Sequence, residues 1–211
     1  KGSAAILMNV NDGEVISMVS YPDFNLNKRQ KIEDENYINR ATKGVYELGS
    51  VFKTFTIAAG LDAGLIEPDT KFLNLDKKLN CGKNTITEYD NKILSDLTVE
   101  EILIKSGNIG SVKIAQMLEI EGLKSFLEKI GVLYKIGFDI EEVGQPIPFK
   151  WGKCKLATVS FGHGITTTPL QLAKGYAIIA NGGYEIKPSL IKRNLKENNK
   201  QKRIIKEGVS E

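Results

Sequence analysis

One apolar stretch constrains the fold of this chain more than any other feature. Between Val51 and Leu61 the apolar side chains cover most of the circumference of a helix, and a helix that is apolar nearly all round is buried. Lys53 lies inside this stretch, although burial disfavours the charged form of an amine. A lysine at the start of a buried helix therefore predicts a chemical role for its amine.

Ser50 precedes Lys53 by three positions and directly follows Gly49. This spacing places both side chains on one face of a helix, one turn apart, so the Lys53 amine can reach the Ser50 oxygen. At the helix N-terminus, unpaired N–H groups and the helix dipole favour developing negative charge. Burial would keep Lys53 neutral, so that it can accept the Ser50 proton. The pair suits acyl transfer by a serine nucleophile with a lysine base.

The same spacing also has structural interpretations. Ser189 and Lys192 repeat it, but they follow Pro188 in a lysine-rich tail without a buried helix, and we interpret that pair as surface. For the first pair, the structural alternative is that Lys53 points to solvent while Ser50 only caps the helix.

A second motif, Ser106-Gly107-Asn108, lies at a break between two predicted helices. The first helix runs from Thr98 to Lys105, and the second runs from Ile109 to Leu118. Thr98 is a candidate N-cap, because glutamates follow it in the first turn. Ser106 and Asn108 would project from the break. Ser-x-x-Lys, Ser-Asp-Asn and Lys-Thr-Gly together are typical of penicillin-binding proteins and class A β-lactamases. Here Gly107 replaces the middle Asp.

These motifs and their surroundings resemble the transpeptidase domain of class B penicillin-binding proteins, and within it the septal, division-specific type. The most specific part is Gly162-His-Gly164 followed by Thr168-Pro-Leu-Gln-Leu-Ala173. Residues 4–24 are similar to the opening hairpin of the family and the loop after it, and residues 39–41 to its segment upstream of the nucleophile. Asn108 favours the septal type, because the elongation type tends to carry Asp there. The resemblance covers almost the whole chain.

The resemblance implies a two-step reaction on peptidoglycan stem peptides. Ser50 would attack the penultimate D-alanine carbonyl, release D-alanine and pass the acyl group to an amine of another stem. Lys53 would take the serine proton, Ser106 would relay a proton to the leaving amine, and Asn108 would hold the substrate amide and steady Lys53. The Ser50 N–H would supply one oxyanion donor. The candidate substrate-binding residues are Gly107, Gly162 and Gly164.

The implied fold is α+β, an antiparallel sheet flanked by helices, as in penicillin-binding-protein transpeptidases and serine β-lactamases. The Lys-Thr-Gly triad does not occur, and Lys206-Glu-Gly208 is no substitute, because Glu207 would put a carboxylate where a substrate carboxylate should bind. Residues 203–211 resemble a segment upstream of the missing edge strand, which would supply the second oxyanion donor. We therefore expect residues 1–211 to be a partial transpeptidase domain, incomplete at the C-terminal edge and weak or inactive alone. The membrane anchor and the N-terminal non-catalytic domain of the family would lie outside it.

By the same resemblance, the expected partners are peptidoglycan stem peptides, β-lactam antibiotics and cell-division membrane proteins that include a septal glycosyltransferase. The expected location is the inner membrane, with the catalytic domain in the periplasm. No cofactor is implied. Two other functions stay open. A serine hydrolase of the same fold, a β-lactamase or D,D-carboxypeptidase, would turn over rather than stay acylated, and a binding or scaffold module would carry these motifs idle.

Charge and apolar patterning argue against other classes. The 29 basic and 26 acidic residues give a net charge of +3, spread along the chain without a basic run interleaved with aromatics, so nucleic acid is not an expected partner. The densest basic region, residues 187–206, is interpreted as a solvated hairpin or tail. No apolar run approaches the ~18 residues of a membrane span.

The cysteines and the single histidine do not form a recognisable site. Cys81 and Cys154 lack a nearby Cys or His partner, so no metal site is predicted. A disulfide between them and two free thiols are both open. His163 lies between two glycines, which a turn commonly needs for its backbone conformation. We therefore interpret His163 as structural rather than as part of a triad.

The remaining elements are predicted from periodicity and from turn residues. An Asp-Gly turn separates two β-type runs at residues 4–10 and 14–20. The buried helix is expected over 50–64, with Gly64 as its C-cap. Other expectations are a loop with a short helix at 22–39, short strands within 66–95, a helix at 122–130, turns after 131, and a helix at 168–181 with Pro169 in its first turn.

Overall fold

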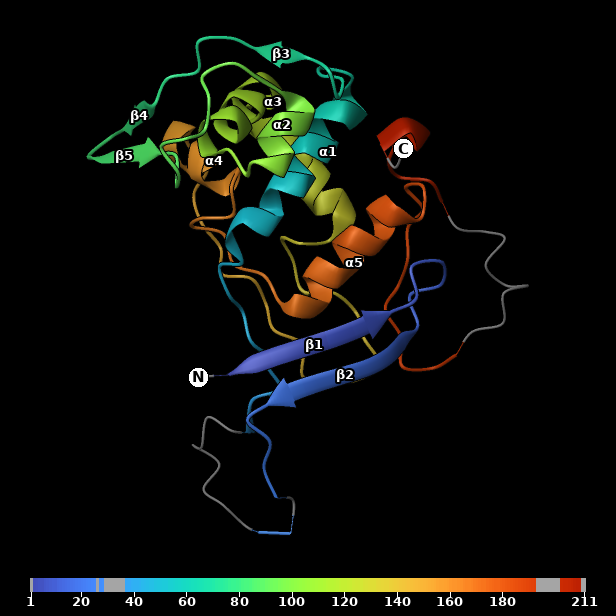
Figure 1. Ribbon diagram of the computed structural model, residues 1–211. Helices are drawn as coiled ribbons and strands as arrows, with labels where there is room; N and C mark the ends of the chain where they lie inside the picture. The colour runs from blue at the N-terminus through green and yellow to red at the C-terminus, as the bar shows by residue number, and fades with distance from the viewer. Residues whose placement is uncertain (1, 26, 29–36, 193–201, 210–211) are drawn as a thin grey trace. The chain divides into compact units, whose positions relative to one another are not determined.

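The computed structural model describes residues 2–25, 27–28, 37–192 and 202–209 (Figure 1). The chain divides into two compact units. Unit 1 comprises residues 1–46, 130–147 and 166–210, and unit 2 comprises residues 47–129, 148–165 and 211. Helices and short antiparallel strands occur together, so the α+β class is confirmed. The described strands form three separate two-stranded sheets rather than one.

Unit 1 opens with the predicted hairpin. Strands β1 (Ser3–Met8) and β2 (Val15–Tyr21) pair antiparallel, with an irregularity between Leu7 and Met8 (Figure 1). The turn between them uses Gly13 at φ +79, a conformation that favours glycine. Asp12 accepts a hydrogen bond from the Glu14 N–H at 2.9 Å and closes the turn. The hairpin predicted around residues 11–13 is confirmed.

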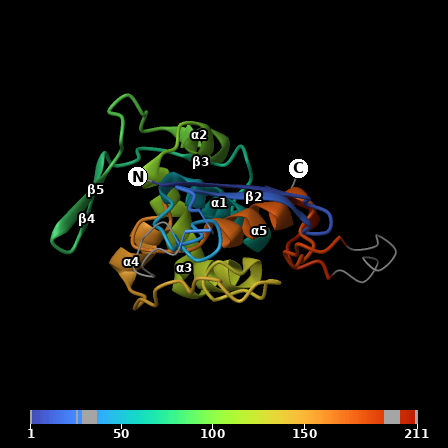
Figure 2. The same ribbon diagram turned by 90° about the horizontal axis from the view of Figure 1, so that it is seen from below.

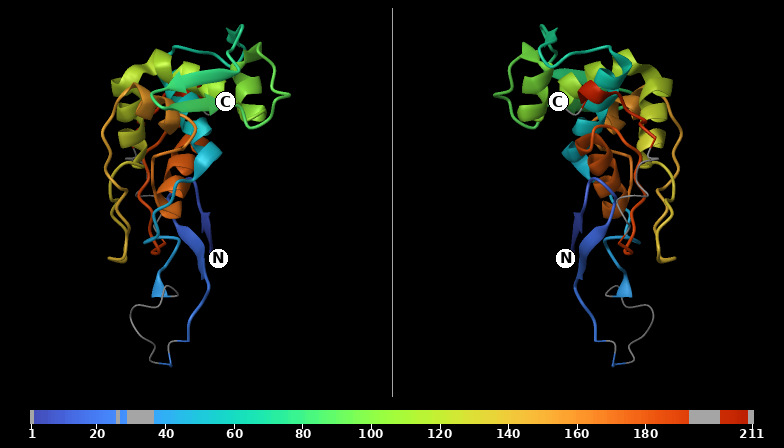
Figure 3. Two further views of the ribbon diagram at one scale, coloured as in Figure 1. Left: turned by 90° about the vertical axis from the view of Figure 1, so that its left-hand side faces the viewer. Right: turned by 90° about the vertical axis from the view of Figure 1, so that its right-hand side faces the viewer.

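Helix α5 (Pro169–Ala180) lies alongside β1 in unit 1, as both side views show (Figure 3). Thr168 and Gln171 form a capping box, each side chain accepting a hydrogen bond from the other's backbone N–H at 3.1 Å. Proline at the first helical position suits this start. The helix predicted over 168–181 is confirmed. An apolar core of this unit contains Leu170 of α5 together with Val15, Ile136 and Val143, with Ile6, Met8, Met18 and Phe138 packed against them.

Unit 2 contains the predicted buried helix. A 3-10 turn, η2 (Gly49–Phe52), leads into α1 (Lys53–Ala63), which ends at Gly64 with φ +70. Phe52 and Phe55 are buried, and their rings meet edge to face at 5.3 Å. The extent and the glycine C-cap match the prediction, except that the first turn is 3-10 rather than α-helical.

Two further helices of unit 2 surround the second motif. Helix α2 (Val99–Ile104) starts at a capping box between Thr98 and Glu101. Helix α3 (Asn108–Ile130) is interrupted at Glu119, whose φ of 58° and ψ of −179° are not helical. The interruption separates the two helices that the sequence predicts on either side of it. Helix α4 (Lys153–Val159) was not predicted, because seven residues are too few to show a helical period.

The small strands of unit 2 lie where short strands were expected. Strand β3 (Lys71–Phe72) pairs with β6 (Leu97–Thr98), and β4 (Lys78–Cys81) pairs with β5 (Asn84–Thr87). The β4–β5 hairpin lies at the edge of its unit, on the same side as α4 (Figure 2). A disulfide joins Cys81 to Cys154 of α4, with the two Cα atoms 5.2 Å apart, so the cysteines are paired.

One interpretation from the sequence needs correction. Ser189 is only 2% exposed, and its hydroxyl donates a hydrogen bond to Asp139 at 2.8 Å, so it is not a surface residue. It belongs to no helix, and Lys192 is exposed. The short helix predicted within 22–39 and the middle of the basic tail lie partly outside the described residues. Within the described part of the chain, no helix is long and apolar enough to cross a membrane.

Candidate active site

Ser50 and Lys53 occupy contrasting environments one turn apart. Ser50 lies exposed in η2 after Gly49, whose φ of +65 turns the chain into the helix. Lys53, the first residue of α1, is 1% exposed. The Ser50 hydroxyl is therefore accessible to a substrate, while the Lys53 amine one turn away is buried. The alternative in which Lys53 points to solvent is wrong.

The Lys53 amine meets three oxygen atoms. Its Nζ donates to Ser106 O at 2.5 Å and to Ser106 Oγ at 2.8 Å, and it lies 3.1 Å from Ser50 Oγ. A neutral amine has two N–H donors and one lone pair. If both donors go to Ser106, the lone pair is left for the Ser50 O–H. The geometry thus suits proton transfer from Ser50 to Lys53.

The pKa of Lys53 fits this use. Burial lowers the pKa of Lys53 from 10.5 to about 8, while the negative charge of Glu88 opposes the shift. Near pH 7 about a tenth of the Lys53 amines would then be neutral. That fraction is several hundred times larger than for an ordinary lysine, so the site can supply a base at neutral pH.

Ser106 occupies a turn between α2 and α3. Its φ is +53, which non-glycine residues rarely adopt. Backbone hydrogen bonds from Ser106 N to Leu103 O at 3.0 Å and from Gly107 N to Ile102 O at 2.8 Å brace the turn on its upstream side. This conformation presents both the carbonyl and the hydroxyl of Ser106 to Lys53. A strained residue at such a point is a sign of function.

Asn108 begins α3 beside this turn. Its side-chain Nδ2 donates to the Thr87 carbonyl at 2.8 Å, whereas the hydrogen bonds of Lys53 run to Ser50 and Ser106. The structure therefore brings three of the four candidate catalytic residues into direct contact and places the fourth next to them. The expected contact of Asn108 with substrate stays a prediction.

The sequence analysis missed Glu88, which lies directly after β5. Its carboxylate accepts hydrogen bonds from the Asn108 N–H at 2.6 Å and from the Ile109 N–H at 2.9 Å. Glu88 precedes Asn108 by 20 positions, in a region without periodicity. No signal in the sequence pairs these residues, because only the path of the chain brings them together.

Each candidate substrate-binding glycine has a defined place in the packing or hydrogen bonding of unit 2. Gly162, with φ +78, packs directly on the Gly49 backbone. Gly164 accepts a hydrogen bond from Lys155 Nζ at 3.1 Å through its carbonyl, and Gly107 is buried in the motif turn. These positions support the Ser50 turn and its surroundings. Substrate binding by the three glycines stays a prediction.

The ion pair of His163 is with an acidic side chain and not with Ser50 or Lys53. Its imidazole is exposed, with Nδ1 3.1 Å from a carboxylate oxygen of Glu47. The hydroxyl of Ser50 contacts Lys53 instead. Among the described residues, Ser50 is therefore paired with Lys53 rather than with His163.

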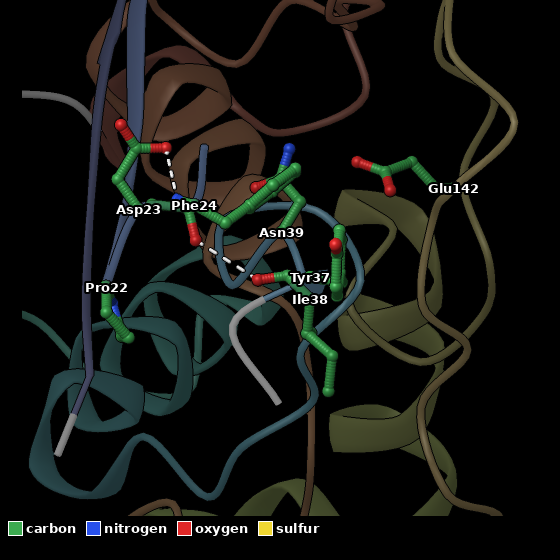
Figure 4. Close-up of a pocket in the computed structure, with 8 residues that line it drawn as sticks. Pro22, Asp23, Phe24, Tyr37, Ile38, Asn39 and Glu142 are labelled. Atoms are coloured by element: carbon green, nitrogen blue, oxygen red, sulfur yellow. Dashed lines mark hydrogen bonds between the residues drawn. The ribbon is translucent and has the colours of Figure 1, made fainter. Parts of the chain in front are cut away.

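A separate hollow of about 270 Å³ lies within unit 1 (Figure 4). Ser20 is the serine that lines this hollow. Its Oγ donates a hydrogen bond to Ile38 O at 3.2 Å and accepts one from Arg40 N at 2.9 Å. No lysine or histidine lines it among the described residues. The hollow thus lacks the base that Ser50 has. Its lining residues are Ser20, Pro22, Asp23, Phe24, Tyr37, Ile38, Asn39 and Glu142.

Comparisons with known proteins identify the family that the chain matches. The family described as penicillin binding protein transpeptidase domain matches residues 3–211. The chain is 34% identical over 194 residues to the "Probable peptidoglycan D,D-transpeptidase FtsI" of Caulobacter vibrioides, covering 92% of this chain and 32% of that protein. It is 30% identical over 213 residues to the "Probable peptidoglycan D,D-transpeptidase PenA" of Neisseria flavescens, covering 100% and 52%. The chain spans about a third to a half of the length of these relatives.

Solved structures are similar over nearly the whole chain. The apo transpeptidase domain of Burkholderia pseudomallei penicillin-binding protein 3 aligns with a TM-score of 0.84 at 26% identity, covering 99% of this chain and 59% of that one. A structure described as a peptidoglycan glycosyltransferase from Burkholderia ambifaria gives 0.84 at 25% identity, covering 99% and 62%. The fold predicted from the sequence is confirmed.

Proposed function

The chain belongs to the penicillin-binding protein transpeptidase domain family, and on that premise we propose that it carries the acyl-transfer site of a peptidoglycan D,D-transpeptidase. The observation that carries the proposal is the contact of the buried Lys53 amine with Ser50 Oγ and with both oxygens of Ser106. This arrangement joins an exposed nucleophile, a base and a proton relay in one place.

In the first step, neutral Lys53 takes the Ser50 proton as Ser50 Oγ bonds to the carbonyl carbon of the donor stem peptide. The amide C–N bond then breaks. The proton passes from Lys53 to Ser106 Oγ, 2.8 Å away, and Ser106 gives its own proton to the departing amine of D-alanine. An acyl-serine ester remains, and Lys53 is neutral again.

In the second step, an amine of another stem peptide attacks the ester carbonyl. Its proton leaves through the same Ser106 and Lys53 relay and returns to Ser50 Oγ as the ester C–O bond breaks. The product is a new amide, the cross-link, and free Ser50. The Ser50 N–H at the start of η2 would stabilise the oxyanion in both steps.

The names of the relatives support a role in septal wall synthesis. Several of them are named FtsI, including the Escherichia coli K12 protein, which is 30% identical over 187 residues. We therefore place the reaction in cross-linking during cell division, with β-lactams as inhibitors and a septal glycosyltransferase among the partners. The catalytic domain would work on the periplasmic side of the inner membrane.

Intact-mass spectrometry after incubation with benzylpenicillin tests this function. The Lys-Thr-Gly triad does not occur in these 211 residues, so the complete gene product is measured beside the 211-residue chain. We expect a long-lived adduct of one penicillin on the gene product, absent from Ser50→Ala and retained in Ser17→Ala, which removes another exposed serine. An adduct that is lost within minutes would indicate a hydrolase. A gene product without any adduct would favour an idle scaffold.

A further inference from the structure

We propose that Glu88 is a positioning residue of this site, whose carboxylate fixes the Ser106–Asn108 turn against Lys53. Its effect on acylation rests on the proposed function, but its effect on the turn does not. Glu88 touches neither Ser50 nor the Lys53 amine in the hydrogen bonds described. It acts through the backbone that carries Ser106.

The carboxylate binds the first two amides of α3. One oxygen accepts from Asn108 N at 2.6 Å and the other from Ile109 N at 2.9 Å. The first N–H groups of a helix have no partner within the helix, and its dipole favours a negative charge there. Hydrogen bonds to a carboxylate are shorter and stronger than those between neutral groups. Glu88 therefore caps α3 from a distant part of the sequence.

Thr87, the residue before Glu88, also binds Asn108. The Thr87 carbonyl accepts a hydrogen bond from Asn108 Nδ2 at 2.8 Å, so Asn108 is held through its backbone and its side chain at once. Thr87 ends β5, and β5 pairs with β4. The end of this hairpin thus fixes the orientation of the third residue of the motif.

The turn needs an anchor on this side. Ser106 keeps a φ of +53 that costs energy unless its surroundings enforce it. Upstream, α2 holds the turn through the Ser106 and Gly107 amides. Downstream, Glu88 and Thr87 hold Asn108, and the Ser111 hydroxyl donates a hydrogen bond to the Gly107 carbonyl at 2.8 Å. Without the carboxylate, the turn can relax, and both Ser106 oxygens would move away from Lys53.

The Glu88 charge also acts on Lys53. It raises the pKa of Lys53 against the larger lowering by burial. Other charged groups on the neighbouring helices do not account for the shift of the Lys53 pKa. They are Asp62 on α1, Glu100, Glu101 and Lys105 at α2, and Lys113, Glu119, Glu121, Lys124, Glu128 and Lys129 on α3. Removing the Glu88 charge should therefore lower the pKa of Lys53 further, which a purely structural support would not do.

Four variants test the proposal. Glu88→Ala removes charge and both acceptors, Glu88→Gln keeps the size without the charge, and Glu88→Asp keeps the charge. Glu100→Gln is the matched control, since Glu100 is an exposed acid of the same unit. Acylation of the complete gene product by a fluorescent penicillin is followed from pH 6 to pH 10. The Lys53 13Cε resonance of the 211-residue chain is titrated in parallel.

We expect Glu88→Ala to lower the acylation rate constant at least tenfold, and Glu88→Asp to recover to within threefold of the native protein. The Lys53 midpoint should move to lower pH in Glu88→Gln and Glu88→Ala but not in Glu100→Gln. If Glu88→Ala does not fold, the Gln and Asp variants decide.

Two results would overturn the proposal. One is a folded Glu88→Ala or Glu88→Gln variant that matches Glu100→Gln in rate and in Lys53 midpoint. The other is a loss of rate that follows lost thermal stability, with no shift of the midpoint and no recovery in Glu88→Asp. If the native protein is not acylated but the NMR midpoint still shifts in Glu88→Gln, the transpeptidase function fails while the positioning role stands.

Discussion

Gly162 packs so closely on Gly49 that a side chain at position 162 would overlap the Gly49 carbonyl oxygen. Both residues have positive φ, +78 for Gly162 and +65 for Gly49. They differ in their surroundings, because a Cβ at Gly49 would meet open space. The nucleophile turn is therefore supported from behind by a backbone contact that only glycine at position 162 permits.

This difference predicts unequal effects of two alanine substitutions. Gly49→Ala should cost about 1–2 kcal/mol, because only the positive φ is unfavourable. Gly162→Ala should cost more than ~2 kcal/mol and lower acylation at least tenfold, because the clash displaces the residue before Ser50. Urea denaturation and penicillin acylation measure both effects. Gly152→Ala, at an open position with extended backbone, is the control, and equal losses in the Gly49 and Gly162 variants would contradict the packing argument.

The rate of acylation should depend on the protonation state of Lys53. Because burial lowers the pKa of Lys53 to about 8 and only the neutral amine accepts the Ser50 proton, the rate should rise with pH up to about 8 and then level off. Lys53→Arg should lose acylation more than a hundredfold at every pH, since a guanidinium stays protonated. Stopped-flow acylation at pH 6–10 measures the profile. A flat profile would show that another group is the base.

The same pKa predicts a dependence of stability on pH. Between pH 8 and pH 10.5 the unfolded Lys53 binds a proton that the folded protein does not, so stability rises with pH in this window. Relative to Lys53→Met, which cannot titrate, the native chain should gain about 3 kcal/mol across it. Urea denaturation of both proteins at several pH values measures the difference, in which the other lysines cancel. No change in the difference would mean that the folded amine keeps an ordinary pKa.

Local signals in the sequence predicted the parts of the site that local structure determines. The helix that carries Ser50 and Lys53 follows from an apolar run, and the starts of α2 and α5 follow from the capping residues Thr98 and Thr168. Contact between Ser50 and Lys53 follows from the helical spacing. Their meeting with Ser106 could be expected only from the family resemblance, since it joins distant segments.

Long-range placement explains what the sequence did not predict. Glu88 caps α3 only because the β4–β5 hairpin returns to it, and no local pattern encodes that path. For the same reason the sequence leaves both a disulfide and two free thiols open for Cys81 and Cys154, which the structure pairs. The lysine-rich neighbours of Ser189 predict a surface position, but its hydroxyl donates a hydrogen bond to Asp139 inside unit 1.

Removal of the Cys81–Cys154 disulfide should destabilise the chain without removing the active site. The cysteines are 73 positions apart, so the cross-link restricts a long loop of the unfolded chain, and the Cys81→Ala/Cys154→Ala variant should lose roughly 2–4 kcal/mol. Trypsin should cleave faster after Lys83, an exposed residue in the turn of the hairpin that the bond ties to α4. Acylation should fall less than in Glu88→Ala, because the bonds from Glu88 to α3 do not depend on the cysteines. Urea denaturation, peptide mapping and acylation measure these effects, with reductant added to the native protein as a second route to the open hairpin. Unchanged stability and cleavage in the variant would contradict this prediction.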